Sequence, residues 1–175
     1  MKVFLIGMMG CGKSYWAQKL AEKTDTKWTD LDENIVRFEK KTISEIIKTQ
    51  NWDYFRLLEQ KILKKITKKN ITFIATGGGT PCYFDNLEVM KNNGQVVYLK
   101  TPVELIFQRL MSGDRERPLL KNKPPEKLFS YLQNLLSERE VYYQKAHYIA
   151  SQSPDNQLLG DEILEYLKTQ NMHFD

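Results

Sequence analysis

Short apolar runs alternate along the chain with stretches in which apolar residues recur every three or four positions. The short runs predict strands, and a run that is wholly apolar predicts a strand buried on both faces of a sheet. The expected strands cover residues 3–6, 27–30, 71–75, 96–99 and 147–150. The helical spacing predicts helices that begin after residue 12 and then cover residues 34–48 (with an interruption near Thr42), 53–69, 102–111, 128–145 and 158–168, with one more opened by Pro81.

Strands that alternate with helices indicate a parallel sheet with helices on both of its faces. Ligands of such sheets bind at the carboxyl ends of the strands, so we expect a functional site at that edge. One long polar stretch, Ser112–Lys127, contains three of the six prolines. We expect it to form a long mobile loop.

Composition narrows the class of protein. The 175 residues are 41% hydrophobic and 27% charged, which fits a single folded domain. A net charge of +4 is too small to indicate a nucleic-acid-binding face. Cys11 and Cys82 lack the spacing of metal ligands. They also suggest no disulfide framework, which favours a reducing cytosol. No apolar run is long enough to span a membrane, and we expect a cytoplasmic monomer that binds neither nucleic acid nor a membrane.

The segment Gly7–Ser14 matches the phosphate-binding pattern G-x-x-x-x-G-K-[ST] at every fixed position. Its glycines let the backbone turn so that successive N–H groups point at phosphate oxygens. Lys13 is placed to bridge the β- and γ-phosphates, and the Ser14 hydroxyl is placed for Mg²⁺. The alternative is a glycine turn before a solvated helix. Cys11 is expected to fill a small loop position rather than to act as a nucleophile.

Acidic and glycine-rich segments follow two of the other predicted strands. Alternation along an extended chain would put Asp30 and Asp32 on one side, where one could help to hold the metal and the other could meet a hydroxyl group. The alternative is that Asp32 caps a helix. Gly77–Gly79 leaves the backbone bare, which permits close approach by a ligand; the alternative there is a loose turn.

Arginines on predicted helices and in the polar loop are further candidates. Arg56 and Glu59 lie three residues apart, the spacing of an ordinary surface pair. Arg139 lies between two glutamates, where a solvated helix face is the default interpretation. Arg115 and Arg117 lie in the polar loop, which either closes over a phosphate or is a disordered basic segment.

Together these residues resemble the shikimate kinase family over nearly the whole chain. The landmarks are Gly7–Ser14, Asp30-Leu31-Asp32, Phe55-Arg56 with Glu59, Gly77-Gly78-Gly79, Arg117-Pro118-Leu119-Leu120, and Arg139 with Tyr143 four residues on. The family usually has Gly-Glu just before its Phe-Arg pair, where this chain has Asn51-Trp52.

The resemblance implies ATP-dependent phosphorylation of the 3-hydroxyl group of shikimate, a step towards chorismate and the aromatic amino acids. It implies a three-layer α/β/α sandwich around a central parallel sheet, similar to P-loop nucleoside-triphosphate hydrolases and nucleoside-monophosphate kinases. Residues 1–175 would form one domain, with a substrate-binding helical segment at about 33–60 and a lid at about 112–127. The alternatives are a gluconate-type kinase on the same fold and a non-catalytic P-loop nucleotide-binding protein.

Site residues follow from the resemblance by position in this sequence. The implied cofactors are ATP and Mg²⁺, and the implied catalytic residues are Lys13, Asp32 and Arg117. The implied substrate contacts are Asp32, Arg56, Gly77, Gly78, Gly79 and Arg139. The implied metal ligands are Ser14, directly, and Asp30 nearby. The implied nucleotide contacts are Gly10, Cys11, Gly12, Lys13, Ser14, Tyr15, Arg109, Arg117 and Asn156.

Overall fold

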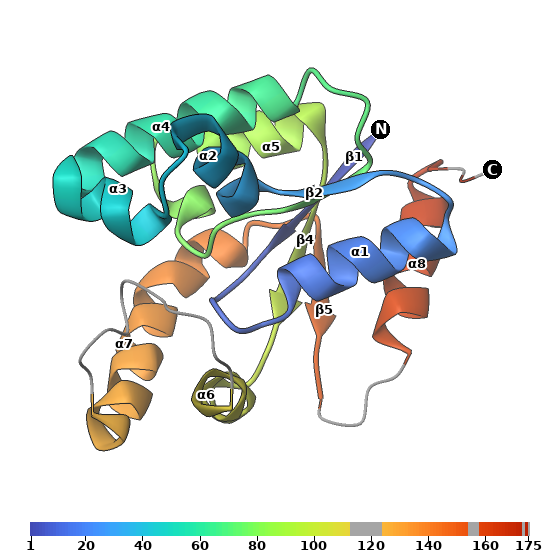
Figure 1. Ribbon diagram of the computed structural model, residues 1–175. Coiled ribbons are helices and arrows are strands. Elements are labelled where there is room, and N and C mark those ends of the chain that lie inside the picture. The colour runs from blue at the N-terminus through green and yellow to red at the C-terminus, as the bar shows by residue number, and fades with distance from the viewer. Residues whose placement is uncertain (113–123, 154–157, 173, 175) are drawn as a thin grey trace.

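A five-stranded parallel sheet forms the centre of the molecule (Figure 1). The structure is a computed structural model that describes residues 1–112, 124–153, 158–172 and 174. The strands are β1 (Lys2–Ile6), β2 (Trp28–Asp30), β3 (Phe73–Ala75), β4 (Gly94–Lys100) and β5 (Tyr148–Ser151). They lie in the order β2-β3-β1-β4-β5, so β1 has β3 on one side and β4 on the other.

Helices connect these strands and cover the sheet. They are α1 (Lys13–Lys23), α2 (Leu31–Glu39), α3 (Ile43–Thr49), α4 (Trp52–Ile66), the 3₁₀ turn η1 (Thr80–Cys82), α5 (Asn86–Asn93), α6 (Val103–Met111), α7 (Pro125–Tyr143) and α8 (Leu159–Thr169). None of the helices within the described ranges is both long enough and apolar enough to cross a membrane.

Alternation along the buried strands divides the core in two. Phe4 and Ile6 of β1 pack with α4, α5 and α7 on one face, whereas Val3 and Leu5 pack with α1 and α8 on the other. Figure 1 shows α1 and α8 together on the second face. Helices on both faces explain why the strands read as apolar runs. The predicted parallel sheet between two helical layers is therefore confirmed.

The predicted interruption near Thr42 is confirmed, because separate helices α2 and α3 lie on either side of it. Thr42 caps α3: its hydroxyl accepts a hydrogen bond from the backbone N–H of Glu45, and the Glu45 carboxylate accepts one from the backbone N–H of Thr42. This reciprocal pair satisfies two free backbone donors at the start of α3.

Several predicted boundaries are wrong by a few residues, and two of them have a clear cause. Pro81 opens only the short turn η1, because Tyr83 is extended and Phe84 has a positive φ, so α5 begins at Asn86. The polar stretch predicted to be a loop through Lys127 is helical from Pro125 onwards. A proline fits the first turn of a helix because the backbone N–H that it lacks would have no partner there.

The sheet order brings three predicted segments to one edge. The glycine loop follows β1, Asp30 ends β2, and Gly77–Gly79 follows β3. Since β2, β3 and β1 are parallel neighbours, their carboxyl ends lie side by side. The predicted position of the functional site is thus consistent with the fold.

Candidate active site

The loop after β1 has the shape of a phosphate cradle. Gly7, Gly10 and Gly12 have φ values of 137°, 81° and 92°, a region that residues with side chains rarely adopt. The ammonium group of Lys13 lies over the loop and donates hydrogen bonds of 2.9 Å to the carbonyl oxygens of Gly7 and Met8. The loop leads directly into the N-terminus of α1, where the helix dipole favours an anion.

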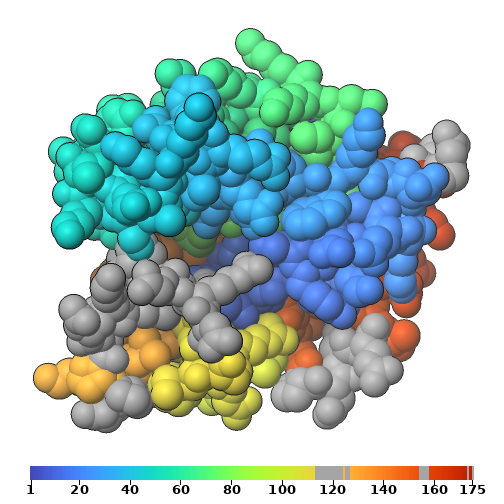
Figure 2. All heavy atoms as spheres, viewed as in Figure 1, coloured from blue at the N-terminus to red at the C-terminus, as the bar shows by residue number. Residues whose placement is uncertain are grey.

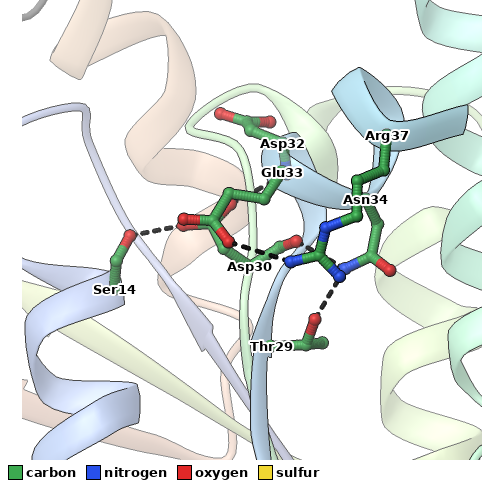
Figure 3. A network of polar contacts seen from close by, with 7 residues as sticks. All are labelled: Ser14, Thr29, Asp30, Asp32, Glu33, Asn34 and Arg37. Carbon is green, nitrogen blue, oxygen red and sulfur yellow. Dashed lines mark hydrogen bonds and ion pairs between the residues drawn. The ribbon is translucent and has the colours of Figure 1, made fainter. Parts of the chain in front are cut away.

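Ser14 and Asp30 meet beside this loop. The Ser14 hydroxyl on α1 donates to one carboxylate oxygen of Asp30 at the end of β2 (Figure 3). The other Asp30 oxygen accepts a 2.8 Å hydrogen bond from the backbone N–H of Asp32. Asn34 braces the same corner, because its amide donates to the Thr29 hydroxyl and to the Asp30 carbonyl oxygen.

Asp30 and Asp32 do not lie on one side of an extended strand, contrary to what the sequence analysis predicted. The strand ends at Asp30 and Asp32 lies in the first turn of α2, so the two residues do not alternate along one extended chain. The helix cap is Asp30 rather than Asp32, since the Asp30 carboxylate accepts the N–H at the start of α2.

A cavity of about 120 Å³ lies next to the phosphate loop. Its lining includes the predicted substrate contacts, which come from four separate segments: Asp32, Arg56, Gly77, Gly78, Gly79 and Arg139. Met9, Ile43, Trp52, Phe55 and Glu59 complete it. A small cavity with two guanidinium groups, carboxyl groups and apolar walls is suited to a small anion that also carries hydroxyl groups.

Arg56 and Glu59 form a buried ion pair rather than an ordinary surface pair. Their nitrogen and oxygen atoms lie 2.7 Å apart, and the two side chains are 7% and 0% exposed. The second Glu59 oxygen accepts a 2.5 Å hydrogen bond from the Thr80 hydroxyl. The guanidinium group of Arg56 also lies 4.2 Å from the centre of the Tyr83 ring. Removing one partner of such a pair costs about 3–5 kcal/mol, because the other charge stays buried.

Arg139 is also buried, at 8% exposed, which contradicts its default placement on a solvated helix face. It projects from α7 into the same cavity as Arg56. Two guanidinium groups from distant parts of the chain therefore share one small space with the Asp32 carboxyl group.

The three glycines after β3 lie very close to neighbouring groups. A Cβ atom at Gly79 would lie 2.6 Å from a guanidinium nitrogen of Arg56, and one at Gly77 would lie 2.8 Å from a Glu59 oxygen. A Cβ atom at Gly78 would lie 3.2 Å from the backbone nitrogen of Met9. The turn is therefore packed against the charged groups of the cavity, and the interpretation as a loose turn is wrong.

Asp32 has an unusual electrostatic environment. The pKa of its carboxyl group is raised to about 7, chiefly by burial and also by the nearby carboxylates of Asp30 and Glu59, against the opposing effect of Lys13 and Arg56. Within the described residues, neither Oδ1 of Asp32 nor Nε of Arg56 has a hydrogen-bond partner, although both atoms are buried. Buried polar atoms of this kind are suited to contact with a ligand.

The larger hollow, of about 420 Å³, lies on the other side of the loop. Gly12, Tyr15, Trp16, Arg109 and Gln152 line it, together with Ser153 and Leu159. The predicted nucleotide contacts Tyr15 and Arg109 are thus brought next to the phosphate loop. Figure 2 shows the blue atoms of the N-terminal segment beside the yellow atoms of α6, and Arg109 of α6 donates a long 3.4 Å hydrogen bond to the carbonyl oxygen of Gly10.

Gln152 is a residue of this cavity that sequence reasoning missed. Its amide nitrogen donates a 2.6 Å hydrogen bond to the carbonyl oxygen of Cys11, and its amide oxygen accepts a 3.1 Å hydrogen bond from Arg109. The side chain is 6% exposed. No local pattern could have found it, because its partner Cys11 is 141 residues away.

Arg115, Arg117 and Asn156 lie outside the described residues, so their predicted roles stay predictions. Cys11 is fully buried in the loop, as expected for a small packing residue.

The loop and its surroundings fit a nucleotide bound with magnesium. In the part of the chain that the structure describes, no group of three or more His, Cys, Asp or Glu side chains is arranged so that it could hold a metal ion by itself. Mg²⁺ commonly binds through one or two protein oxygens together with phosphates and water. The adjacent oxygens of Ser14 and Asp30 match that donor set.

The chain is similar to known proteins of one family. The family model for shikimate kinase matches residues 9–168. A shikimate kinase from Azobacteroides pseudotrichonymphae genomovar. CFP2 is 44% identical over 147 residues, which cover 83% of this chain and 86% of that protein.

Two solved structures are also similar. The crystal structure of shikimate kinase from Bacteroides thetaiotaomicron matches this chain with a TM-score of 0.89 and 29% sequence identity. The match covers 98% of this chain and 99% of the Bacteroides chain. Shikimate kinase from Acinetobacter baumannii in complex with shikimate has a TM-score of 0.89 at 33% identity and covers 98% of this chain and 95% of that one.

Proposed function

This chain belongs to the shikimate kinase family, and from that premise we propose that it phosphorylates the 3-hydroxyl group of shikimate. The phosphoryl donor is ATP and the metal cofactor is Mg²⁺, and the step lies on the route to the aromatic amino acids. The observation that carries the proposal is the cavity beside the phosphate loop, where Arg56, Arg139 and Asp32 come together.

The two arginines are suited to hold the substrate carboxylate. A guanidinium group binds a carboxylate through two parallel hydrogen bonds, so a pair of them fixes orientation as well as charge. Glu59 orients Arg56 for this task through the 2.7 Å ion pair. The second cation, Arg139, approaches from α7.

Asp32 is suited to orient the attacking hydroxyl group. Its raised pKa makes it a better proton acceptor than an ordinary carboxylate. Phosphoryl transfer in such enzymes is largely dissociative, so early and complete deprotonation of the alcohol is unnecessary. We propose that Asp32 first accepts a hydrogen bond from the hydroxyl group and later takes its proton.

Lys13 is suited to neutralise charge on the transferring phosphoryl group. Its ammonium group donates to two carbonyl oxygens of the loop, which holds it against the loop. Mg²⁺ held by Ser14 and Asp30 would offset phosphate charge. Arg117 stays a predicted clamp on the phosphates.

We also propose that one domain carries this activity in a cytoplasmic monomer without a nucleic-acid partner. Its substrate-binding helical segment would be residues 33–60 and its lid residues 112–127. The reducing cytosol fits two free cysteines, of which Cys11 is fully buried. Light scattering on the purified protein checks the monomer directly.

The test of the function is a coupled assay of ADP release. Shikimate should support turnover, whereas quinate, gluconate and nucleoside monophosphates should support little or none, because shikimate alone is expected to satisfy the two arginines and Asp32 together. Faster turnover with gluconate or a nucleotide would assign the cavity to another acceptor. ADP release that no acceptor stimulates would indicate a nucleotide-binding protein without kinase activity.

Arg139→Lys is expected to raise the KM for shikimate about tenfold, because lysine keeps the charge but loses the paired hydrogen bonds. The KM for ATP should stay within twofold of the wild-type value. The matched control is Arg37→Lys, which alters an exposed arginine paired with Glu33 at 3.4 Å. Steady-state kinetics on the three proteins decide the matter. An unchanged KM for shikimate would remove Arg139 from the substrate site.

Gln152→Leu is expected to weaken nucleotide binding about tenfold, because it removes the hydrogen bonds to Cys11 and Arg109 that join the phosphate loop to the larger hollow. Calorimetric titration with ADP measures the effect. Gln18→Leu, which removes an exposed amide bonded to Glu22, should bind ADP like the wild type. If the two variants bind ADP equally well, Gln152 has no part in nucleotide binding.

A further inference from the structure

The turn of Gly77–Gly79 is held by contacts from outside it, although its composition makes it flexible. It lies against the charged groups of the 120 Å³ cavity that contains Arg56, Arg139 and Asp32, which we call the acid-binding cavity: a Cβ atom at Gly77 or Gly79 would lie under 3 Å from Glu59 or Arg56. Glycine also loses more conformational freedom on folding than any other residue. Three glycines in a row therefore hold one conformation only if groups outside the turn fix it.

Hydrogen bonds fix both ends of the turn. Before it, the hydroxyl group and the backbone N–H of Thr76 both donate to the carbonyl oxygen of Leu5, at 2.9 and 3.2 Å. After it, the hydroxyl group of Thr80 donates to Glu59, and the carbonyl oxygen of Thr80 accepts from the Asn86 amide at 3.0 Å.

One side chain fixes the middle of the turn. The hydroxyl group of Tyr143 donates a 2.6 Å hydrogen bond to the carbonyl oxygen of Gly78, across 65 residues of sequence. Tyr143 is fully buried, and its ring packs against Tyr98 with the ring centres 5.0 Å apart. Burial also raises the pKa of the Tyr143 phenol far above its ordinary value, so the group remains a donor at any physiological pH.

The same helix brings Arg139 to this glycine. Arg139 and Tyr143 are four residues apart on α7 and so lie on one helical face. A Cβ atom at Gly78 would lie 3.3 Å from a guanidinium nitrogen of Arg139. The position of the turn and the position of the second arginine are therefore set together by α7.

Fixing the Gly78 carbonyl also fixes a backbone donor. The peptide bond is trans, so the N–H of Gly79 points in the opposite direction to the carbonyl group that Tyr143 holds. Among the described residues, no hydrogen bond uses the backbone N–H of Gly78 or Gly79, and both residues line the acid-binding cavity. These N–H groups are thus available to an oxygen of a bound substrate.

We propose that Tyr143 is a positioning residue for the acid substrate: its hydroxyl group locks the Gly78–Gly79 peptide so that the turn presents backbone donors to the substrate beside Arg139. The proposal rests on the proposed function, because it assumes that the cavity holds the acceptor. The buried hydroxyl group of Tyr143 should therefore affect binding of the acceptor but not binding of the nucleotide.

Tyr143→Phe isolates that hydroxyl group, because the ring and its packing stay in place. We expect the KM for shikimate to rise about five- to tenfold and the KM for ATP and kcat to change less than twofold, in line with the loss of one buried hydrogen bond. Calorimetric titration of the ligand-free protein with shikimate should show the same loss in affinity without any turnover. ADP affinity in the same experiment should equal that of the wild type.

Tyr98→Phe is the matched control. Tyr98 is the other ring of the buried aromatic pair, and none of the hydrogen bonds of the described residues uses its hydroxyl group. Its variant should bind shikimate and ADP like the wild type. Thermal melting of both variants, with assays below the lower midpoint, excludes unfolding as the cause of any difference.

Equal shikimate affinity in the Tyr143 variant and the wild type would overturn the proposal, as would parallel losses for shikimate and ADP. These outcomes differ from a failure of the proposed function. In that case the wild-type protein itself would neither bind shikimate nor release ADP in its presence.

Discussion

Lys13→Ala is expected to lower kcat/KM by at least about a thousandfold, the largest effect of any single substitution considered for this protein. An arginine that reaches the transferring phosphoryl group is worth about 10³–10⁵ in rate in related nucleotide enzymes, and we expect a loss of similar size for the lysine of the loop. Lys13 lies over the phosphate loop, with its ammonium nitrogen 2.9 Å from the carbonyl oxygens of Gly7 and Met8. The coupled assay of ADP release, with ATP varied at saturating shikimate, measures the loss in kcat/KM for ATP.

The matched control for that variant is Lys19→Ala on the exposed side of α1. Lys19 is exposed and pairs with Glu22 at the surface, so its removal should leave turnover unchanged. Shikimate binding to the Lys13 variant, measured by calorimetry, should persist because the acid-binding cavity does not include Lys13. Turnover within tenfold of the wild-type value would show that Lys13 is not the principal phosphate cation.

Asp32→Asn is expected to lower kcat by about 10²–10⁴-fold, the usual contribution of a positioned acid or base. Asparagine has the same shape, but its amide is a far weaker proton acceptor. ADP affinity should fall less than threefold. The melting temperature should not fall, because burial and two neighbouring carboxylates already disfavour the ionised Asp32, as its raised pKa indicates.

Asp53→Asn, which changes an exposed carboxylate in the first turn of α4, is the control for that variant. Rapid-quench measurement of a single turnover separates the chemical step from product release. Equal losses in kcat and in ADP affinity would assign Asp32 to the metal rather than to the hydroxyl group.

Buried strands were the part of the fold that the sequence predicted best. The run at residues 3–6 corresponds to β1, Lys2–Ile6, and the run at 71–75 contains β3, Phe73–Ala75. Both are apolar on two faces because helices cover both sides of the sheet, and this leaves a continuous signal. The start of α5 was mispredicted because a proline favours the beginning of a helix without determining its length.

The sequence predicted which residues belong to the candidate site, but it did not predict the contacts between them. The spacing of Arg56 and Glu59 is visible in the sequence, yet their burial depends on the turn at Gly77–Gly79 and on Thr80. Tyr143 is visible only as a position after Arg139, because its hydrogen bond joins segments 65 residues apart. Contacts set by tertiary packing leave no local pattern to read.

A crystal structure with ADP, Mg²⁺ and shikimate would show whether a carboxylate-bearing acceptor binds beside the phosphate loop with its hydroxyl group at Asp32. We expect the carboxylate of shikimate to lie within hydrogen-bond distance of Arg56 and Arg139, and a ring hydroxyl group within that distance of Asp32, about 2.5–3.2 Å. Shikimate bound outside this cavity, or with its carboxylate turned away from both arginines, would contradict this expectation.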